Sequence, residues 1–180
     1  MSRVRITGGE WRSRLVKVVD SPGLRPTPDR VRETLFNWLG QDLSGLDCLD
    51  LFAGTGILGF EAASRGARRV TQIEENQRVF EALRQNAASL GGDRLEPVRA
   101  DALKFVASAG ARGCGYDLVF LDPPYRQGLL EKVAPHLAAI AKPGMRIYAE
   151  AEHVLERLGD WVTVKQGHAG QVYYHLLEKE

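Results

Sequence analysis

The chain has 180 residues, a formal net charge of +1, 44% hydrophobic residues and 26% charged residues. A chain of this length folds as one domain and buries a sizeable core. Its apolar runs are far shorter than the roughly 18 residues of a membrane span, and its first residues lack the apolar core of a signal peptide. We therefore expect no membrane partner. Cys48 and Cys114 are far apart and lack metal-ligand spacing, so we also expect no disulfide, no metal site and a cytoplasmic location.

The predicted elements begin with two short strands at 3–7 and 14–19, followed by a proline-rich stretch. A helix is predicted to begin near Arg30, with Asp29 as its cap. Strands and helices then alternate, with strands at 46–52, 68–74, 95–100, 116–122 and 145–151 and helices at 57–66, 77–91, 101–109, 129–141 and 152–159. Two final strands, at 161–166 and 171–177, are joined by GHAG and predict a hairpin.

This alternation predicts an α/β fold with a doubly wound, mostly parallel sheet and an antiparallel C-terminal hairpin at one edge. We divide the chain into a basic N-terminal β-hairpin extension, residues 1–26, and the sheet domain, residues 27–180. In such sheets, ligands bind outside the carboxyl ends of the strands, where the strand order reverses. The residues that follow each strand are therefore the candidate site. Nothing in the sequence indicates more than a monomer.

The charge is unevenly distributed. Residues 1–32 hold eight basic and three acidic side chains, a balance of +5, which leaves 16 bases and 20 acids in the remainder. Such a cluster predicts a polyanion partner, since Arg and Lys supply phosphate attraction. The proposed RNA-contacting residues are Arg3, Arg5, Trp11, Arg12, Arg14, Arg25 and Arg30, with Trp11 as an exposed stacking platform. The alternative is a solvated hairpin that only covers a sheet edge.

Three strand ends predict the ligand of the sheet. After the first one, DLFAGTG offers the candidate contacts Asp50, Phe52, Ala53, Gly54, Thr55 and Gly56. The glycines allow a tight turn and close approach to a ligand, and an acid at this place suits a cation instead of a pyrophosphate. Glu74, about 20 residues beyond the glycines, is placed to accept the hydroxyls of a ribose. Asp101, with Ala102, either caps a short helix or accepts from an adenine amine.

Each of these acids alone has an ordinary explanation as a solvent-facing or capping residue. Together they ask for a ligand that carries a ribose, an adenine amine and positive charge. S-adenosylmethionine fits this description, whereas NAD and ATP do not.

The fourth strand end reads LDPPY, with the candidate catalytic residues Asp122, Pro123, Pro124 and Tyr125. Asp122, which we also expect to contact the cofactor, can accept one hydrogen of an exocyclic base amine, and the carbonyl of Pro123 the other. The two prolines keep that carbonyl fixed, and Tyr125 offers a flat face to a base taken out of its stack. The ordinary alternatives are a capping aspartate, a Pro-Pro stop and a core tyrosine.

These motifs resemble the amino-methyltransferases of the Rossmann-like, S-adenosylmethionine-dependent class. More narrowly, nearly the whole chain resembles the bacterial 16S ribosomal RNA guanine-N2 methyltransferase family known as RsmD, in RITGGEWRSR, SPGLRPTPDRVRETLFNWL, DLFAGTGILGFEAASRGA and AGQVYYHLLEK. The resemblance implies methylation of the exocyclic N2 amine of a guanine in 16S ribosomal RNA. It also implies a partly or fully assembled small ribosomal subunit as the substrate.

Other functions remain open at this point. The motif DPPY also occurs in adenine and cytosine amino-methyltransferases that act on DNA or RNA, although 180 residues leave no room for a DNA target-recognition domain. A related motif, usually with Asn in place of Asp, is typical of enzymes that methylate a protein glutamine amide. A catalytically silent RNA-binding assembly factor is the non-enzyme alternative.

Overall fold

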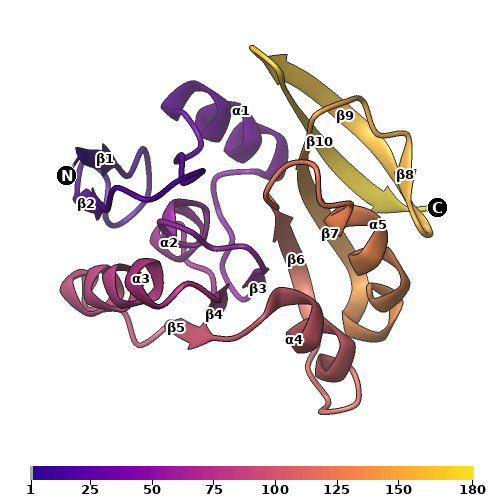
Figure 1. The fold of residues 1–180 in the computed structure, drawn as a ribbon, viewed down its shortest axis with the longest axis horizontal. Coiled ribbons are helices and arrows are strands. Elements are labelled where there is room, and N and C mark those ends of the chain that lie inside the picture. Colours follow the sequence, from indigo (N-terminus) through magenta and orange to yellow (C-terminus); the bar gives the residue numbers. More distant parts are fainter. Residues whose placement is uncertain (1) are drawn as a thin grey trace.

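The computed structural model describes residues 2–180 and contains one eight-stranded sheet and a separate two-stranded hairpin. The strand order of the large sheet is β5-β4-β3-β6-β7-β10-β9-β8 (Figure 1). The first five strands in this order run parallel, and β10 is antiparallel to both of its neighbours. Their bounds are β3 Asp47–Asp50, β4 Arg69–Glu74, β5 Leu95–Arg99, β6 Tyr116–Leu121, β7 Ala141–Ala151, β8 Arg157–Leu158, β9 Trp161–Ala169 and β10 Val172–Lys179. The predicted mostly parallel sheet with an antiparallel C-terminal hairpin is confirmed.

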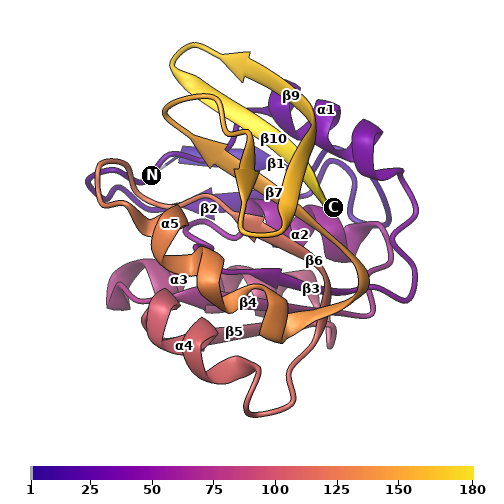
Figure 2. The same ribbon diagram turned by 90° about the vertical axis from the view of Figure 1, so that its right-hand side faces the viewer.

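Helices cover both faces of this sheet. Figure 2 shows α4 and α5 in front of the sheet and α2 behind it. One face carries α1, α2 and α3, and the other carries α4, α5 and two short 3-10 turns. The bounds are α1 Asp29–Leu39, α2 Ile57–Ser64, α3 Gln77–Leu90, α4 Ala102–Ala109 and α5 Leu129–Val133, with turns at Ala134–His136 and Ala138–Ile140.

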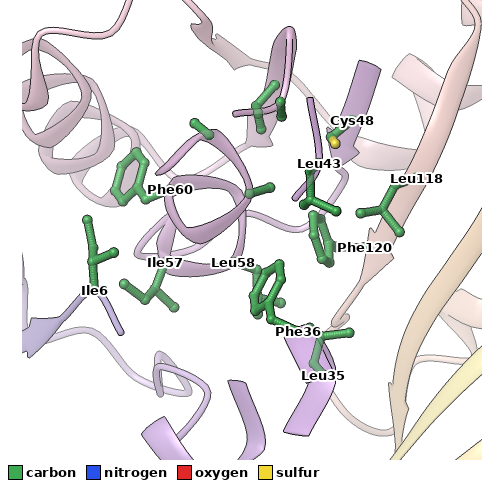
Figure 3. Close-up of a cluster of buried hydrophobic side chains, with 14 of the residues drawn as sticks. Ile6, Leu35, Phe36, Leu43, Cys48, Ile57, Leu58, Phe60, Leu118 and Phe120 are labelled. Atoms are coloured by element: carbon green, nitrogen blue, oxygen red, sulfur yellow. The ribbon is translucent and has the colours of Figure 1, made fainter. Parts of the chain in front are cut away.

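Two hydrophobic clusters fill the spaces between the sheet and its helices. Successive side chains of a strand point to opposite faces, so Phe120 belongs to the first cluster while Val119 and Leu121 belong to the second. Figure 3 shows the first cluster, in which Phe36 of α1 and Phe60 of α2 lie on the same side of the sheet as Phe120. Ala53 and Ile57, which follow β3, belong to this cluster, so it reaches the strand ends where the site is expected.

The N-terminal hairpin joins the first cluster instead of standing apart. Its strands, β1 (Ser2–Arg5) and β2 (Leu15–Val18), pair antiparallel, and Figure 1 shows them beside α2 and α3. Ile6, Trp11 and Val16 are buried in the cluster. The backbone N–H of Glu10 donates to Ser64 O at 2.7 Å, so the hairpin turn is bonded to the end of α2.

The prediction that Trp11 is an exposed stacking platform is wrong. The side chain is 5% exposed, and the Arg94 guanidinium lies 5.1 Å from its ring centroid. The backbone N–H of Trp11 donates to Ser64 Oγ at 2.8 Å, which holds the turn against α2. Tertiary contacts across more than fifty residues therefore convert a turn that looks solvent-exposed in sequence into part of the core.

A buried carboxylate connects the hairpin, α1 and α2. Glu61 of α2 is 0% exposed and accepts hydrogen bonds from the Thr7 backbone N–H at 3.0 Å and the Thr7 hydroxyl at 3.0 Å. It also pairs with the guanidinium groups of Arg32 and Arg65. Arg32 in turn donates to Arg5 O at 2.7 Å and Thr27 O at 2.8 Å. One base of the N-terminal cluster is thus structural and faces away from solvent.

Three local expectations differ from the structure. Asp29 is the first residue of α1 and pairs with Arg32 instead of capping the helix, because Pro28 holds the cap position. The helix predicted at 129–141 ends at Val133, since Pro135 lacks the N–H that a helix interior requires.

The helix predicted at 152–159 is absent, and this segment contains β8 instead. Leu158 pairs with Trp161 across a turn in which Gly159 has φ +56. No helix in residues 2–180 combines the length and apolar character needed to cross a membrane.

Replacing Glu61 with Ala should lower the free energy of unfolding by about 3 to 5 kcal/mol, because Arg32 and Arg65 would remain buried without their shared acceptor. Urea unfolding of the two proteins measures the difference. The exposed pair Glu81–Arg84 offers a matched control, and Glu81→Ala should change stability by less than about 1 kcal/mol. Equal small losses in both variants would contradict a structural role for Glu61.

Candidate active site

The turn after β3 is fixed by two glycines in the left-handed region. Gly54 has φ +54 and Gly56 has φ +88, and the Gly56 N–H donates to Ala53 O at 2.8 Å. A Cβ on Gly56 would lie 2.4 Å from Leu83 Cδ1 and 2.7 Å from the ring of Phe60. Only glycine satisfies both constraints. The turn therefore brings bare backbone to the carboxyl edge of the sheet at the start of α2, as predicted for this motif.

Asp50 supports this turn from beneath. It is 2% exposed and accepts from the Gly59 N–H at 3.2 Å and from Gln72 Nε2 at 3.3 Å. Gln72 Nε2 also donates to Gly56 O at 3.0 Å, so one amide links the acid to the glycine turn. Burial raises the pKa of Asp50 to about 6. Its carboxylate is buried and bonded to neighbouring protein groups, so Asp50 would act on a cationic ligand through its charge and not by direct contact.

Glu74, the last residue of β4, is hydrogen-bonded to the glycine turn that follows β3. Its Oε1 accepts from the Gly54 N–H at 2.9 Å and its Oε2 from the Asn76 N–H at 2.9 Å. Each carboxylate oxygen has two lone pairs, so both can accept a further hydrogen bond. The half-buried Glu74 thus stands at the rim of the glycine turn with acceptor capacity left over.

Asp101 caps α4, because its Oδ1 accepts from the Lys104 N–H at 2.9 Å. The capping alternative for this residue is therefore realised. Phe52 and Ala102 are half-buried and pack against the second hydrophobic cluster. An apolar rim thus borders the acids at this edge.

The end of β6 carries the DPPY segment beside the end of β7. Leu121 and Ala149 are paired in register and both belong to the second cluster, so the next residues, Asp122 and Glu150, point to the opposite face. Burial, together with the charges of Glu150 and Asp50, raises the pKa of Asp122 well above its usual range. The half-buried Asp122 and the buried Glu150 therefore stand side by side at the strand ends.

Glu150 is held by two hydroxyl groups. Its Oε2 accepts from the Thr27 hydroxyl at 2.9 Å and from the Tyr148 hydroxyl at 2.9 Å. Burial also raises the pKa of Glu150. Sequence reasoning missed Glu150, because it lies within the strand predicted at 145–151, one residue before the end of β7, and not after a strand like the other acids. It also missed the supporting residues Thr27, Tyr148 and Gln72, for which the sequence carries no comparable signal.

The loop after Asp122 leaves an aromatic face open. Pro123 is buried and Pro124 is exposed, while the Tyr125 side chain is 45% exposed. Arg126 has φ +65, and its backbone N–H donates to Glu152 Oε1 at 2.7 Å. This bond ties the loop to the residue that follows β7. Tyr125 is therefore a surface aromatic beside the two acids and not a core tyrosine.

The proline-rich linker, residues 21–28, crosses this edge. A Cβ on Gly54 would lie 3.0 Å from Leu24 Cδ1, so Leu24 covers the glycine turn. Three residues later, Thr27 contacts Glu150. Six of the predicted RNA-contacting arginines lie on the surface of the hairpin, the linker and the start of α1: Arg3, Arg5, Arg12, Arg14, Arg25 and Arg30. The linker thus connects a basic surface directly to the strand ends.

A sheet of this order, with a glycine turn after its central strand and DPPY after the neighbouring one, defines a Rossmann-like domain of the methyltransferase class. The family model described as conserved hypothetical protein 95 matches residues 4–178. Ribosomal RNA small subunit methyltransferase D of Escherichia coli strain K12 is 42% identical over 183 residues, which cover 99% of this chain and 91% of that protein. The chain belongs to this methyltransferase D family, as its motifs predicted.

Solved structures agree with this assignment. The Escherichia coli protein yhhF has a TM-score of 0.87 and 41% identity, with 99% of each chain covered. An RNA methyltransferase from Salinibacter ruber, solved with S-adenosyl-L-homocysteine, has a TM-score of 0.68 and covers 86% of this chain and 94% of its own. At 20% identity, this second likeness shows the fold alone.

Two glycines in the left-handed region, Gly56 and Gly91, allow backbone strain to be distinguished from side-chain crowding. Gly56→Ala should destabilise the protein by about 3 kcal/mol or more, because the new Cβ adds a clash with Leu83 and Phe60 to the cost of a left-handed residue. Gly91→Ala should cost only about 1 kcal/mol, since Gly91 has φ +75 and open space around it. Thermal unfolding measures both. Equal losses would mean that the packing around the turn is not constrained.

Proposed function

We propose that the protein transfers a methyl group from S-adenosylmethionine to the exocyclic N2 amine of a guanine in 16S ribosomal RNA. The observation that carries this proposal is the DPPY segment, in which an acid of raised pKa and an exposed tyrosine ring adjoin a glycine turn at one sheet edge. The relatives named ribosomal RNA small subunit methyltransferase D support a ribosomal RNA substrate.

The acids of the edge fit a cationic donor. Burial disfavours the charged forms of Asp50 and Asp122 and so raises their pKa values. A cation beside them would favour these charged forms, whereas a phosphate would disfavour them further. Glu74 would accept the ribose hydroxyls with its remaining lone pairs. The backbone from Ala53 to Gly56, with Phe52, Asp101 and Ala102, would border the rest of the ligand. S-adenosylmethionine supplies an electrophilic methyl group on a sulfonium.

Asp122 and Pro123 would prepare the amine. The lone pair of an exocyclic base amine is delocalised into the ring, so the nitrogen must pyramidalise before it can attack. Asp122 accepts one amine hydrogen and the Pro123 carbonyl accepts the other, both aimed where positive charge develops on the nitrogen. Pro124 stiffens the loop, and Tyr125 stacks on the base.

Asp122 would also receive the released proton. When the new N–C bond forms and the S–C bond breaks, the methylated amine must lose one proton. A positive charge beside Asp122 would favour its ionised form, and burial with the charges of Glu150 and Asp50 would favour its protonated form once that charge has gone. Its affinity for the proton is therefore greatest at the end of the transfer.

Nucleoside analysis by mass spectrometry tests the proposal. The protein is incubated with cofactor carrying a labelled methyl group and with either free small-subunit RNA or assembled small subunits. The label should appear in N2-methylguanosine, and the assembled particle should be the better substrate. Label confined to methyladenosine, methylcytosine, DNA or protein would favour the alternative amino-methyltransferases.

The silent assembly factor is tested by cofactor binding. Calorimetry should detect S-adenosylmethionine binding to the free protein or to its complex with RNA. If neither the free protein nor its RNA complex binds S-adenosylmethionine, the enzyme proposal is wrong and the silent RNA-binding protein is favoured.

Substitutions of Asp122 and Glu74 should have different effects on cofactor affinity and on the rate of methyl transfer. Asp122→Ala should leave the cofactor affinity nearly intact but reduce the single-turnover rate by about 10²-fold or more, because a preorganised acceptor is removed. Glu74→Gln keeps an acceptor for the Gly54 N–H but should weaken cofactor binding, because one acceptor for a ribose hydroxyl is removed. Calorimetry and single-turnover assays measure both. The reverse pattern would contradict the assignment of the two strand ends.

The basic surface should contribute salt-dependent RNA binding. Arg12 and Arg25 are exposed, and removing one arginine–phosphate interaction should lower the salt slope of RNA affinity by about one. Arg12→Ala with Arg25→Ala should thus lower it by about two, with an unchanged melting temperature. Arg157→Ala, at the far β8 edge and paired with Glu180, should leave the slope unchanged. An unchanged slope with a lower melting temperature would make the segment purely structural.

A further inference from the structure

Glu150 is a second carboxylate at the reacting edge, and the proposed methyl transfer gives it no role. It is 5% exposed and follows Ala149, which is paired with Leu121, so it adjoins Asp122. A buried acid beside another acid is costly unless a ligand or partner compensates for it. The position therefore suggests that Glu150 meets a hydrogen-bond donor of the substrate.

One oxygen of Glu150 is committed and the other is free. Both hydrogen bonds found for this side chain, from Thr27 and Tyr148, end on Oε2. Within residues 2–180, Oε1 is not among the buried polar atoms that lack a partner, so it keeps contact with solvent. Thr27 and Tyr148 thus fix the carboxylate and leave Oε1 as an oriented acceptor.

This acceptor lies beside the proposed base platform. Tyr125 follows Asp122 in the same loop, and burial together with the charges of Asp122, Glu150 and Glu152 raises the pKa of its phenol, so these carboxylates lie near the ring. A base stacked on Tyr125 would present its edge to the two acids. If Asp122 holds the exocyclic amine, Glu150 faces the neighbouring atom of that edge.

Guanine and adenine differ at that atom. Guanine carries an N1–H donor next to its N2 amine, whereas adenine carries an unprotonated N1 acceptor next to its N6 amine. A carboxylate bonds the first and repels the second. We propose that Glu150 Oε1 accepts the N1–H of the target base, so that Glu150 is the residue that selects guanine. This inference rests on the proposed guanine-N2 methylation.

The alternative is that Glu150 only braces the linker through Thr27. Glu150→Gln distinguishes the two, because its amide oxygen can still accept from Thr27 and Tyr148. The amide nitrogen then replaces Oε1 and presents a donor in place of an acceptor. The brace is kept and the polarity facing the base is reversed.

The matching probe is 2-aminopurine at the methylated position. This base keeps the amine at position 2 but has an N1 acceptor in place of the N1–H. The wild-type protein should methylate the guanine substrate at least about 10²-fold faster than the 2-aminopurine substrate. In Glu150→Gln this ratio should fall by about tenfold or more, because the amide now donates to N1 of the analogue.

Glu152→Gln is the matched control. Glu152 lies two residues further along and bonds the Arg126 backbone, so its substitution should leave the guanine-to-2-aminopurine ratio unchanged. If the variants are too slow for a rate, the affinities of the two RNAs in the presence of S-adenosylhomocysteine give the same ratio. The fluorescence of 2-aminopurine reports binding of the analogue, and competition reports binding of the guanine RNA.

The outcomes are separable. An unchanged ratio in Glu150→Gln, with wild-type melting temperature and cofactor affinity, would overturn the selecting role and leave Glu150 as a brace. A wild-type protein that makes no N2-methylguanosine would instead refute the proposed function, and this inference with it. A lower ratio in Glu150→Gln alone supports the inference.

Discussion

The buried carboxylate of Glu61 is the constraint on which the rest of the structure depends. It holds Thr7 of the hairpin, Arg32 of α1 and Arg65 at the end of α2 in one network. Arg32 carries this constraint to the Thr27 backbone, and the Thr27 hydroxyl carries it to Glu150 beside Asp122. One connected set of contacts therefore positions both the basic hairpin and the strand ends that carry Glu150 and Asp122.

The charge distribution follows from this arrangement. Acids gather at the strand ends, where burial raises the pKa of Asp50, Asp122 and Glu150. Exposed arginines lie on the hairpin, on the linker that crosses this edge and at the start of α1. Such an edge suits two ligands of opposite charge, a cationic donor inside the acid cluster and a polyanion over the basic surface. The linker, which contacts the edge through Leu24 and Thr27, lies between the acid cluster and the basic surface.

The sequence predicted the fold and most of the edge because both depend on local signals. Strand–helix alternation indicated the sheet, and glycines or acids after strands indicated the turn, Glu74 and DPPY. Contacts between distant segments could not be predicted in this way. Trp11 is buried by α2 and Arg94, and Arg32 looked like any other surface base although Glu61 buries it. The segment 152–159 was expected to be a helix, but Leu158 pairs with Trp161 and forms β8, since cross-strand pairing outweighs a weak local helix propensity.

We propose above all that the carboxyl edge from Glu74 to Asp122 holds donor and base together. A crystal structure of the protein with S-adenosylhomocysteine tests it most directly. We predict ribose hydroxyls within hydrogen-bond distance of the Glu74 carboxylate, the amino-acid moiety against the Gly54–Gly56 turn, and the sulfur directed toward Asp122 and Tyr125. A ligand bound elsewhere, or one whose sulfur points away from Asp122, would contradict it.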